Sequence, residues 1–542
     1  MTPASPAPAA AAAPQSVAQP GEMTHRQIME ALSGLLLAMF VAMLSSTVVT
    51  NALPTIVGDL HGSQTGYTWI VVATMLAMTA STPIWGKLAD LFSKKLLVQL
   101  ALLIYIAGSM IAAFAPSMGV LIGARVVQGL GVGGLTALVQ VVIATMISPR
   151  ERGRYSGYLG ATFALATVSG PLIGGVVVDS ALGWRGCFFI GLPFAFVAFF
   201  LLQKTLRLPV VKRPVHVDYL GATLLVGGVS TLLIWVSLAG NSFLWGSAVS
   251  YELVAVGLLL LGAAVFVEAR VAVEPVIPLR LFKDRTTTLA TIASAMVGVA
   301  MFGSTVYLSQ YFQTARGMTP TEAGLMSIAM VGGLFVSSLV SGRIISSTGR
   351  WKRFLVGGMA LVVVGLALLG TIDETTSLPV IGVFMAILGV GLGATMQNLV
   401  LSVQNNVTMA DMGAASSMVA FFRSLGGSIG VAVLGAMLSH QVAHQVADGY
   451  VAARRPPTVP ADSHAVPDIP ALPGWEQSIW ETAFGSSFGH IFLVAVPFAM
   501  VALVCVILIR EVPLRTSNLE AEAAASPLVA AELHHAIVES ER

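Results

Sequence analysis

The chain has 542 residues, of which 56% are hydrophobic and only 10% are charged. Ordinary soluble domains carry about 25% charged residues, so the composition excludes a soluble globular protein and indicates one that crosses a membrane. The formal net charge of +2 gives no indication of a nucleic-acid partner, and we expect none.

The chain begins with an Ala/Pro-rich segment over residues 1–22. This segment lacks the basic region and short apolar core of a signal peptide. Its composition predicts a disordered cytoplasmic tail that contributes nothing to the fold.

Fourteen apolar stretches follow, each about as long as the roughly 20 residues that a helix needs to cross a bilayer. Because backbone polar groups in lipid must be satisfied within the segment, these stretches predict an all-α integral membrane protein with fourteen transmembrane helices. They lie near residues 31–57, 67–89, 96–115, 118–147, 154–178, 184–203, 218–240, 250–272, 288–312, 322–345, 354–371, 378–402, 412–438 and 489–509.

The basic residues are distributed asymmetrically about these stretches. With the N-terminus inside, 22 of the 28 Lys and Arg residues fall on one side, four fall on the other, and only Arg125 and Arg423 lie within the membrane. Since cytoplasmic loops carry the excess of basic residues, both termini are expected to be cytoplasmic in a multi-pass cell-membrane protein.

An internal repeat is visible at an offset of 256 residues. "GKLADLFSKK" follows the second stretch and the related "GRIISSTGRWKR" follows the tenth, so that Gly86 corresponds to Gly342. The same offset places Gly170 of the fifth stretch on Gly426. A shared offset predicts two related six-helix bundles, which is the architecture of a carrier that rocks around a central site.

The expected organisation follows from this repeat. The units are the tail 1–22, a first bundle 23–210, a two-helix insert 211–280, a second bundle 281–510 with an extracellular loop over 441–486, and a cytoplasmic tail 511–542.

The fifth stretch contains "SGPLIGG", which places helix-weakening residues inside an apolar run. Gly170 and Gly174 lie one turn apart on one face, and Pro171 removes a hydrogen bond and can bend the helix. A bend beside a smooth face permits sliding, although glycines at this spacing also serve plain helix packing.

Four strings together carry a family resemblance: "LSSTVVTNALPTI", "GKLADLFSKK", "RVVQGLGVGG" and "SGPLIGG". In this order the sequence resembles the fourteen-helix drug/proton antiporter branch of the major facilitator superfamily over essentially its whole length. The resemblance implies the major facilitator fold and alternating access. It also implies that Gly170, Pro171, Gly174 and Gly175 line the interface that opens and closes.

The resemblance also assigns roles to the loop motif that contains Gly86, Asp90 and Lys94. It implies that Asp90 takes part in proton coupling and stabilises the state closed to the cytoplasm. The expected partners are the start of the thirteenth helix and the loop arginines Arg150, Arg152 and Arg154. The alternative for the lysines is that they merely follow the sidedness rule.

Two arginines are expected inside the membrane, where charge is costly and usually functional. Arg125 lies seven residues into its helix, about 10 Å deep, and the resemblance assigns it to proton coupling with Gln128 nearby. Arg423 lies at a similar depth from the other side. It either faces the substrate cavity or orients its helix by bonding backbone carbonyls.

The sequence departs from the family at Ser45, where many members carry an aspartate. No acid falls in the middle third of any predicted helix, so a dedicated dication site is not expected. The expected substrate cavity is polar and almost uncharged. Its candidate residues are Ser45, Thr47, Gln128, Gln310, Gln397 and Arg423.

No catalytic or nucleotide-binding motif is present, so transport energy must come from an ion gradient. We expect a monomeric, non-enzymatic, proton-coupled exporter of drugs or other amphipathic small molecules, without cofactor or metal. An exporter of lipids or of an endogenous metabolite is the alternative, and a membrane receptor without transport is a third reading.

Overall fold

The computed structural model describes residues 25–60, 64–178, 180–206, 208, 218–240, 243–454, 469 and 472–515. The predicted tail 1–22 and residues 516–542 of the C-terminal tail lie outside this range. Within it the chain forms helices and contains no β-strand. The all-α prediction is confirmed.

The first group of helices forms what we call the first bundle. Its helices are α1 (His25–Asp59), α2 (Gln64–Leu91), α3 (Lys94–Ala113), α4 (Met118–Met146), α5 (Pro149–Val178), α6 (Gly186–Phe189) and α7 (Gly191–Thr205), with a 3₁₀ turn η1 (Gly183–Arg185) before α6.

Two further helices, α8 (Tyr219–Leu238) and α9 (Ala248–Arg270), form the insert, and the remainder forms what we call the second bundle. Its helices are α10 (Arg285–Thr314), α11 (Pro320–Met326), α12 (Ile328–Thr348), α13 (Lys352–Leu369), α14 (Leu378–Asn406), α15 (Met412–Ala453) and α16 (Gly474–Leu508), with 3₁₀ turns η2 (Leu279–Lys283) and η3 (Met409–Asp411).

Thirteen helical spans of the described chain are long and apolar enough to cross a membrane. The predicted stretch that is not among these spans corresponds to α5, a helix of 30 residues that packs between α1 and α12. With α5 the helices account for all fourteen predicted stretches.

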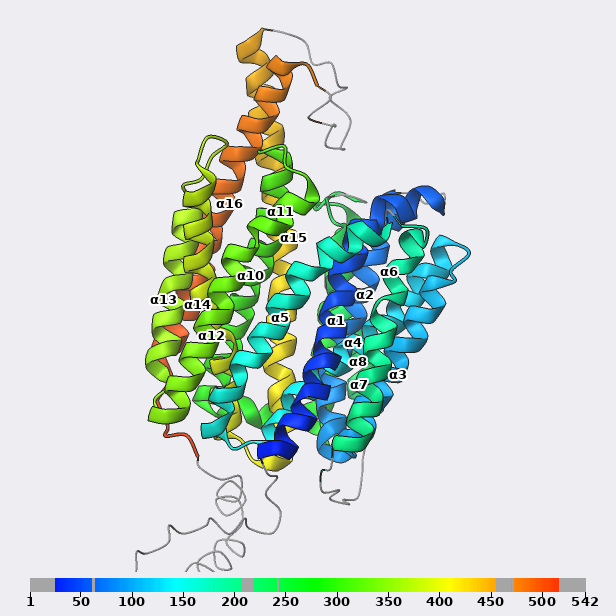
Figure 1. The fold of residues 1–542 in the computed structure, drawn as a ribbon, viewed down its shortest axis with the longest axis vertical. Helices are drawn as coiled ribbons and strands as arrows, with labels where there is room; N and C mark the ends of the chain where they lie inside the picture. Colours follow the sequence, from blue (N-terminus) through cyan, green and yellow to red (C-terminus); the bar gives the residue numbers. More distant parts are fainter. Residues whose placement is uncertain are drawn as a thin grey trace, which may run out of the picture.

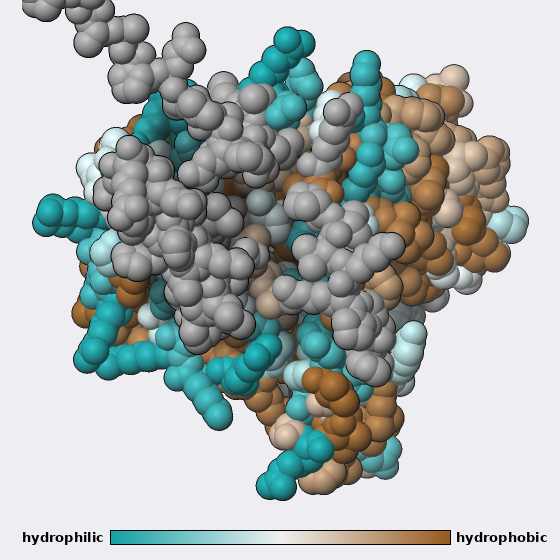
Figure 2. Space-filling view, turned by 90° about the horizontal axis from the view of Figure 1, so that it is seen from below, coloured by the Kyte–Doolittle hydropathy of each residue, from teal (hydrophilic) through white to brown (hydrophobic). Residues whose placement is uncertain are grey.

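The two bundles lie side by side, with α5 and α15 between them (Figure 1). The described chain begins and ends at the lower end of this view, where the backbone N–H of Arg150 donates to the carbonyl of Arg515. Hydrophilic side chains gather over this end, and hydrophobic ones lie around its edge (Figure 2). This polar end and apolar perimeter match a protein surrounded by lipid.

The helices that the 256-residue offset relates to one another also form the contacts between the two bundles. It relates α2 to α12 and α5 to α15, and in the structure α2 packs on α15 while α5 packs on α12. The close contacts are made by glycines that share the offset. A Cβ on Gly413 would lie 2.2 Å from the Gly86 carbonyl, and one on Gly157 would lie 2.5 Å from Leu339.

The segment 441–486, predicted as a loop, is helical at both of its ends, because α15 continues to Ala453 and α16 begins at Gly474. The prediction followed the Pro, Ala and His content of the segment and overlooked an apolar stripe at helical spacing. Val442 and Val446 lie on this stripe and are buried. The Tyr450 hydroxyl donates to Glu476 of α16 and joins the two helices beyond the ends of their neighbours (Figure 1).

Substitution of Gly389 should test the close helix packing. A Cβ there would lie 1.9 Å from the Met330 carbonyl of α12, so Gly389→Ala should cost about 1–3 kcal/mol and lower the melting temperature of the purified protein. Gly357→Ala on α13 is the matched control, since its Cβ would meet nothing within 4 Å. Equal melting temperatures for the two variants would contradict the packing.

Candidate functional site

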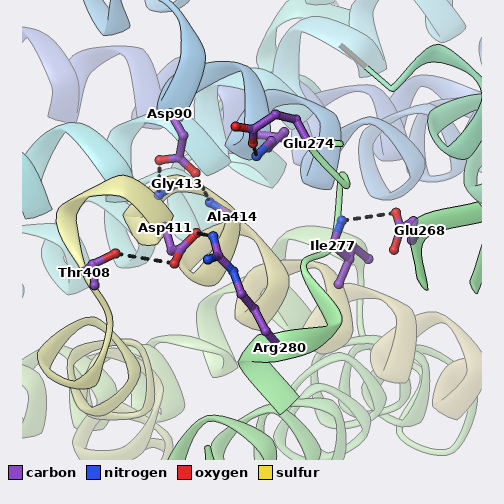
Figure 3. A network of polar contacts seen from close by, with 10 residues as sticks. Asp90, Glu268, Glu274, Ile277, Arg280, Thr408, Asp411, Gly413 and Ala414 are labelled. Carbon is purple, nitrogen blue, oxygen red and sulfur yellow. Dashed lines mark hydrogen bonds and ion pairs between the residues drawn. The ribbon is translucent and has the colours of Figure 1, made fainter. Parts of the chain in front are cut away.

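Asp90, near the end of α2, joins the two bundles. Its Oδ1 accepts a hydrogen bond from the Gly413 N–H (2.7 Å) and its Oδ2 accepts one from the Ala414 N–H (2.8 Å). Both N–H groups belong to the first turn of α15, where the helix dipole favours a negative charge (Figure 3). We call this contact the Asp90 clamp.

The clamp requires a close approach of the two backbones. A Cβ on Gly86, one turn before Asp90, would lie 1.9 Å from Ser417 Oγ. Only glycine fits at Gly86 without moving α15. Lys94 and Lys87 lie near enough to Asp90 to interact with it electrostatically. The sequence motif therefore supplies both the carboxylate and the space that it needs.

Two of the loop arginines expected beside Asp90, Arg150 and Arg152, contact other groups. Arg150 donates to the carbonyls of Ser346 and Ser347 at 3.4 Å each, at the C-terminal end of α12. A cation is favoured at this helix end, as an anion is at the start of α15. The 256-residue offset places Ser346 opposite Asp90 in the repeat. The second copy of the motif therefore meets an arginine through its backbone carbonyls.

Arg152 is buried and also bridges the bundles. It donates to the Ile147 carbonyl at 2.8 Å and to Gln404 Oε1 of α14 at 2.9 Å. Gln404 Nε2 in turn donates to Ser416 Oγ of α15 at 2.9 Å. Arg152 and Gln404 line a cavity of about 30 Å³, large enough for a single water.

A segment between the insert and the second bundle, residues 271–284, extends across the Asp90 end; we call it the strap. Glu274 of the strap pairs with Lys87 of α2, whose side chain is only 9% exposed. Arg280 donates from Nη2 to Asp411 Oδ1 at 2.7 Å, just before α15 (Figure 3). The strap thus contacts the same two elements as the Asp90 clamp.

The base of the strap is held by the end of α9. Glu268, a buried residue, accepts a hydrogen bond from the Ile277 N–H at 3.1 Å (Figure 3). The insert itself packs on both sides of the junction, because α8 contacts α2 and α15.

The helix-five glycines face α1 of their own bundle in this structure. A Cβ on Gly170 would lie 2.1 Å from Thr47 Oγ1, and one on Gly174 would lie 2.9 Å from the Val48 carbonyl. The expectation that they line the contact between the bundles therefore differs from this geometry. Gly157 and Gly160, nearer the start of α5, face α12 instead. The side-chain surroundings of Pro171 and Gly175 lie outside the described part of the chain.

Arg125 lies in a polar network inside the first bundle. It is 3% exposed and donates from Nε to the Ile70 carbonyl (3.3 Å) and from Nη1 to the Gln128 side chain. Gln128 Nε2 donates to Ser109 Oγ at 2.7 Å. The network continues to the Tyr105 hydroxyl, which lies within reach of Ser109 and Ser45. Arg125 is therefore stabilised by neutral acceptors.

The candidate cavity residues do not form one set. Ser45 and Gln128 belong to the Arg125 network, and the Thr47 hydroxyl donates to the Ala166 carbonyl of α5 at 3.3 Å. Gln397 on α14 accepts a hydrogen bond from Gln140 of α4 at 3.3 Å, across the bundles.

The two remaining candidates are Gln310 on α10 and Arg423 on α15. Both are half-buried, and the described residues offer neither side chain a hydrogen-bond partner.

A match to the Major Facilitator Superfamily family model covers residues 35–431. The chain belongs to this superfamily. It is therefore a multi-pass membrane transporter, and it is not an enzyme.

Named relatives agree with this assignment. The transporter is 33% identical over 431 residues to the multidrug transporter protein MdtP of Bacillus subtilis, covering 80% of this chain and 79% of the relative. It is 31% identical over 500 residues to the efflux pump dotC of Dothistroma septosporum, covering 91% and 85%. An uncharacterised MFS-type transporter of Mycobacterium tuberculosis, Rv1877, is 33% identical over 487 residues, covering 89% and 69%.

Solved structures show the same fold. The human organic anion transporter MFSD10 superposes with a TM-score of 0.56 at 14% identity, covering 87% of this chain and 99% of that one. The proton:xylose symporter XylE gives 0.58 at 13%, covering 88% and 96%. At these identities the likeness concerns the fold alone.

The Lys87–Glu274 pair can be tested with a double-mutant cycle. Removing either charge should destabilise the transporter by about 1–3 kcal/mol. This range lies between the values for exposed and for buried ion pairs, because Lys87 is buried while Glu274 is 37% exposed. The melting-temperature changes of Lys87→Gln and Glu274→Gln should not add in the double variant. Glu30→Gln, which breaks the exposed Arg26–Glu30 pair, should have no effect. Additive changes would show that the strap is not held by this pair.

Proposed function

We propose that the transporter is a proton-coupled exporter that exchanges protons for amphipathic small molecules by alternating access. It acts as a monomer in the cell membrane with both termini in the cytoplasm. The named relatives include a multidrug transporter and an efflux pump, which supports export as the direction.

The Asp90 clamp is the observation that carries this proposal. It joins an acid of one bundle to the first N–H groups of a helix of the other, at the end where the described chain begins and ends. Most basic residues belong to this side by the sidedness rule, so we assign it to the cytoplasm. The observed arrangement is then the state closed to the cytoplasm.

Protonation of Asp90 supplies a route for coupling. A neutral carboxyl group loses the charge that α15 and the nearby lysines stabilise, so proton binding weakens the clamp and favours opening to the cytoplasm. Arg125 contributes to coupling by fixing α2 against α4 through the Ile70 carbonyl. In this proposal α5 moves between the bundles and Pro171 is its bend. Gly157 and Gly160 slide on α12, and Gly170 and Gly174, with Gly175 next to them in the sequence, slide on α1.

Reconstitution tests the proposal directly. Purified protein in vesicles should accumulate a lipophilic dye against its gradient when the lumen is acidic, with a matching loss of luminal protons. The dyes should include anionic, neutral and cationic members. Lipid scrambling without dye movement would favour a lipid exporter, and movement of neither would leave the receptor reading.

Asp90→Asn should reduce proton-driven dye transport by at least tenfold. The substitution removes both a titratable group and a charged acceptor worth about 1.5–3 kcal/mol per hydrogen bond. Asp448→Asn is the matched control, because this acid is 70% exposed and lies on the α15 extension. Transport at the wild-type rate by Asp90→Asn would exclude the clamp from the cycle.

A further inference from the structure

Arg423 occupies an unusual position for a charged side chain. It lies 11 residues from Met412 at the start of α15, about 16 Å along the helix axis. This distance is roughly half of the ~30 Å hydrocarbon thickness. A charge at this depth is expensive unless it has a partner or lines a polar space.

The partners that could satisfy Arg423 are missing from the described residues. No hydrogen bond or ion pair joins the guanidinium to any carbonyl, amide or carboxylate among them. The expectation that Arg423 orients its helix by bonding carbonyls therefore finds no support. Arg125 differs, since it is 3% exposed and bonded to the Ile70 carbonyl and to Gln128.

The helical register places Arg423 toward the other helices of its bundle. Ser416 and Gly427 lie on the same stripe of α15, seven residues before and four residues after it. Ser416 is bonded to Gln404 of α14, and a Cβ on Gly427 would lie 2.2 Å from the Phe302 ring of α10. Arg423 therefore lies on a stripe of α15 whose other members meet an apolar ring and a neutral polar group.

The membrane-spanning region, as far as the structure describes it, contains embedded arginines, and its acids do not lie at their depth. In the described part of these helices the acids lie near the ends, as Asp90, Glu268 and Glu322 do. A ligand with a negative group would supply the counter-charge that the protein lacks, and a guanidinium binds a carboxylate through two parallel hydrogen bonds.

We infer that Arg423 binds the negatively charged group of the substrate, and that the exported molecules are amphipathic organic anions. This inference rests on the proposed exporter function and deepens it, since it names the class of molecule that the exporter carries. The apolar part of the anion packs against the face that carries Phe302.

Equilibrium binding to the purified full chain in detergent tests the inference without transport. The probes are dansyl-phenylalanine, its neutral carboxamide and its cationic aminoethyl amide, which share one apolar body. The acid should bind about 10- to 100-fold more tightly than the carboxamide, as expected for a charged hydrogen-bonded pair. Competition by a short-chain phosphatidic acid distinguishes a lipid anion from a free organic acid as the preferred ligand.

Variants of Arg423 assign the preference to this residue. Arg423→Gln should remove the advantage of the acid while changing carboxamide binding by less than twofold. Arg423→Lys should keep part of the advantage, since it retains the charge without the planar fork. Arg353→Gln, which removes an exposed arginine on α13, should leave all three affinities unchanged.

The outcomes separate this inference from the proposed function. Equal binding of acid and carboxamide to the wild type, or an advantage that survives Arg423→Gln, would overturn it even if proton-driven export were observed. Loss of the preference in Arg423→Gln would support the assignment of anion binding to Arg423, even if no proton-driven export occurred. The absence of proton-driven export would refute the proposed exporter function. If Arg423→Gln does not fold, two measurements still test the inference. These are the relative affinities of acid and carboxamide for the wild type, and the reduced preference for the acid expected of Arg423→Lys.

Discussion

The structure depends on one constraint of the bilayer: the backbone groups of a spanning helix are satisfied within the helix and are free only at its ends. Polar contacts between the two bundles therefore concentrate at helix ends. Asp90 meets the free N–H groups at the start of α15, and Arg150 meets the carbonyls at the end of α12. Each contact places the charge that the helix dipole favours. Between the ends, glycines at positions such as Gly157 and Gly389 bring the backbones together.

Much of this arrangement could be predicted from the sequence, because the length of an apolar stretch determines where a chain can cross a membrane. The repeat offset also predicted which helices correspond. The family resemblance predicted that Asp90 contacts the start of the thirteenth membrane-spanning helix, which is α15. The structure places Asp90 at this position. A local motif of this kind is also legible in the sequence, since Thr319 and Glu322 stand at capping-box spacing and the Thr319 N–H donates to the Glu322 carboxylate at the start of α11.

Other parts could not be read in this way, because helix direction and register decide which side a residue faces. "SGPLIGG" shows that Gly170 and Gly174 share a face, but only the fold shows that this face meets α1. Glu274 is an ordinary loop acid in the sequence, and its pairing with Lys87 spans 187 residues. The helical ends of segment 441–486 could not be predicted because polar residues interrupt their apolar stripe.

The helix α15 has 42 residues and is therefore about 63 Å long, roughly twice the thickness of the hydrocarbon layer. Its first residues accept the clamp, and its last residues project beyond the neighbouring helices with α16 (Figure 1). One continuous rod thus connects a junction on one side of the bilayer to a protruding tip on the other. An antibody fragment bound at this tip would contact the same helix that carries the clamp, from the opposite side of the bilayer and without contact with lipid.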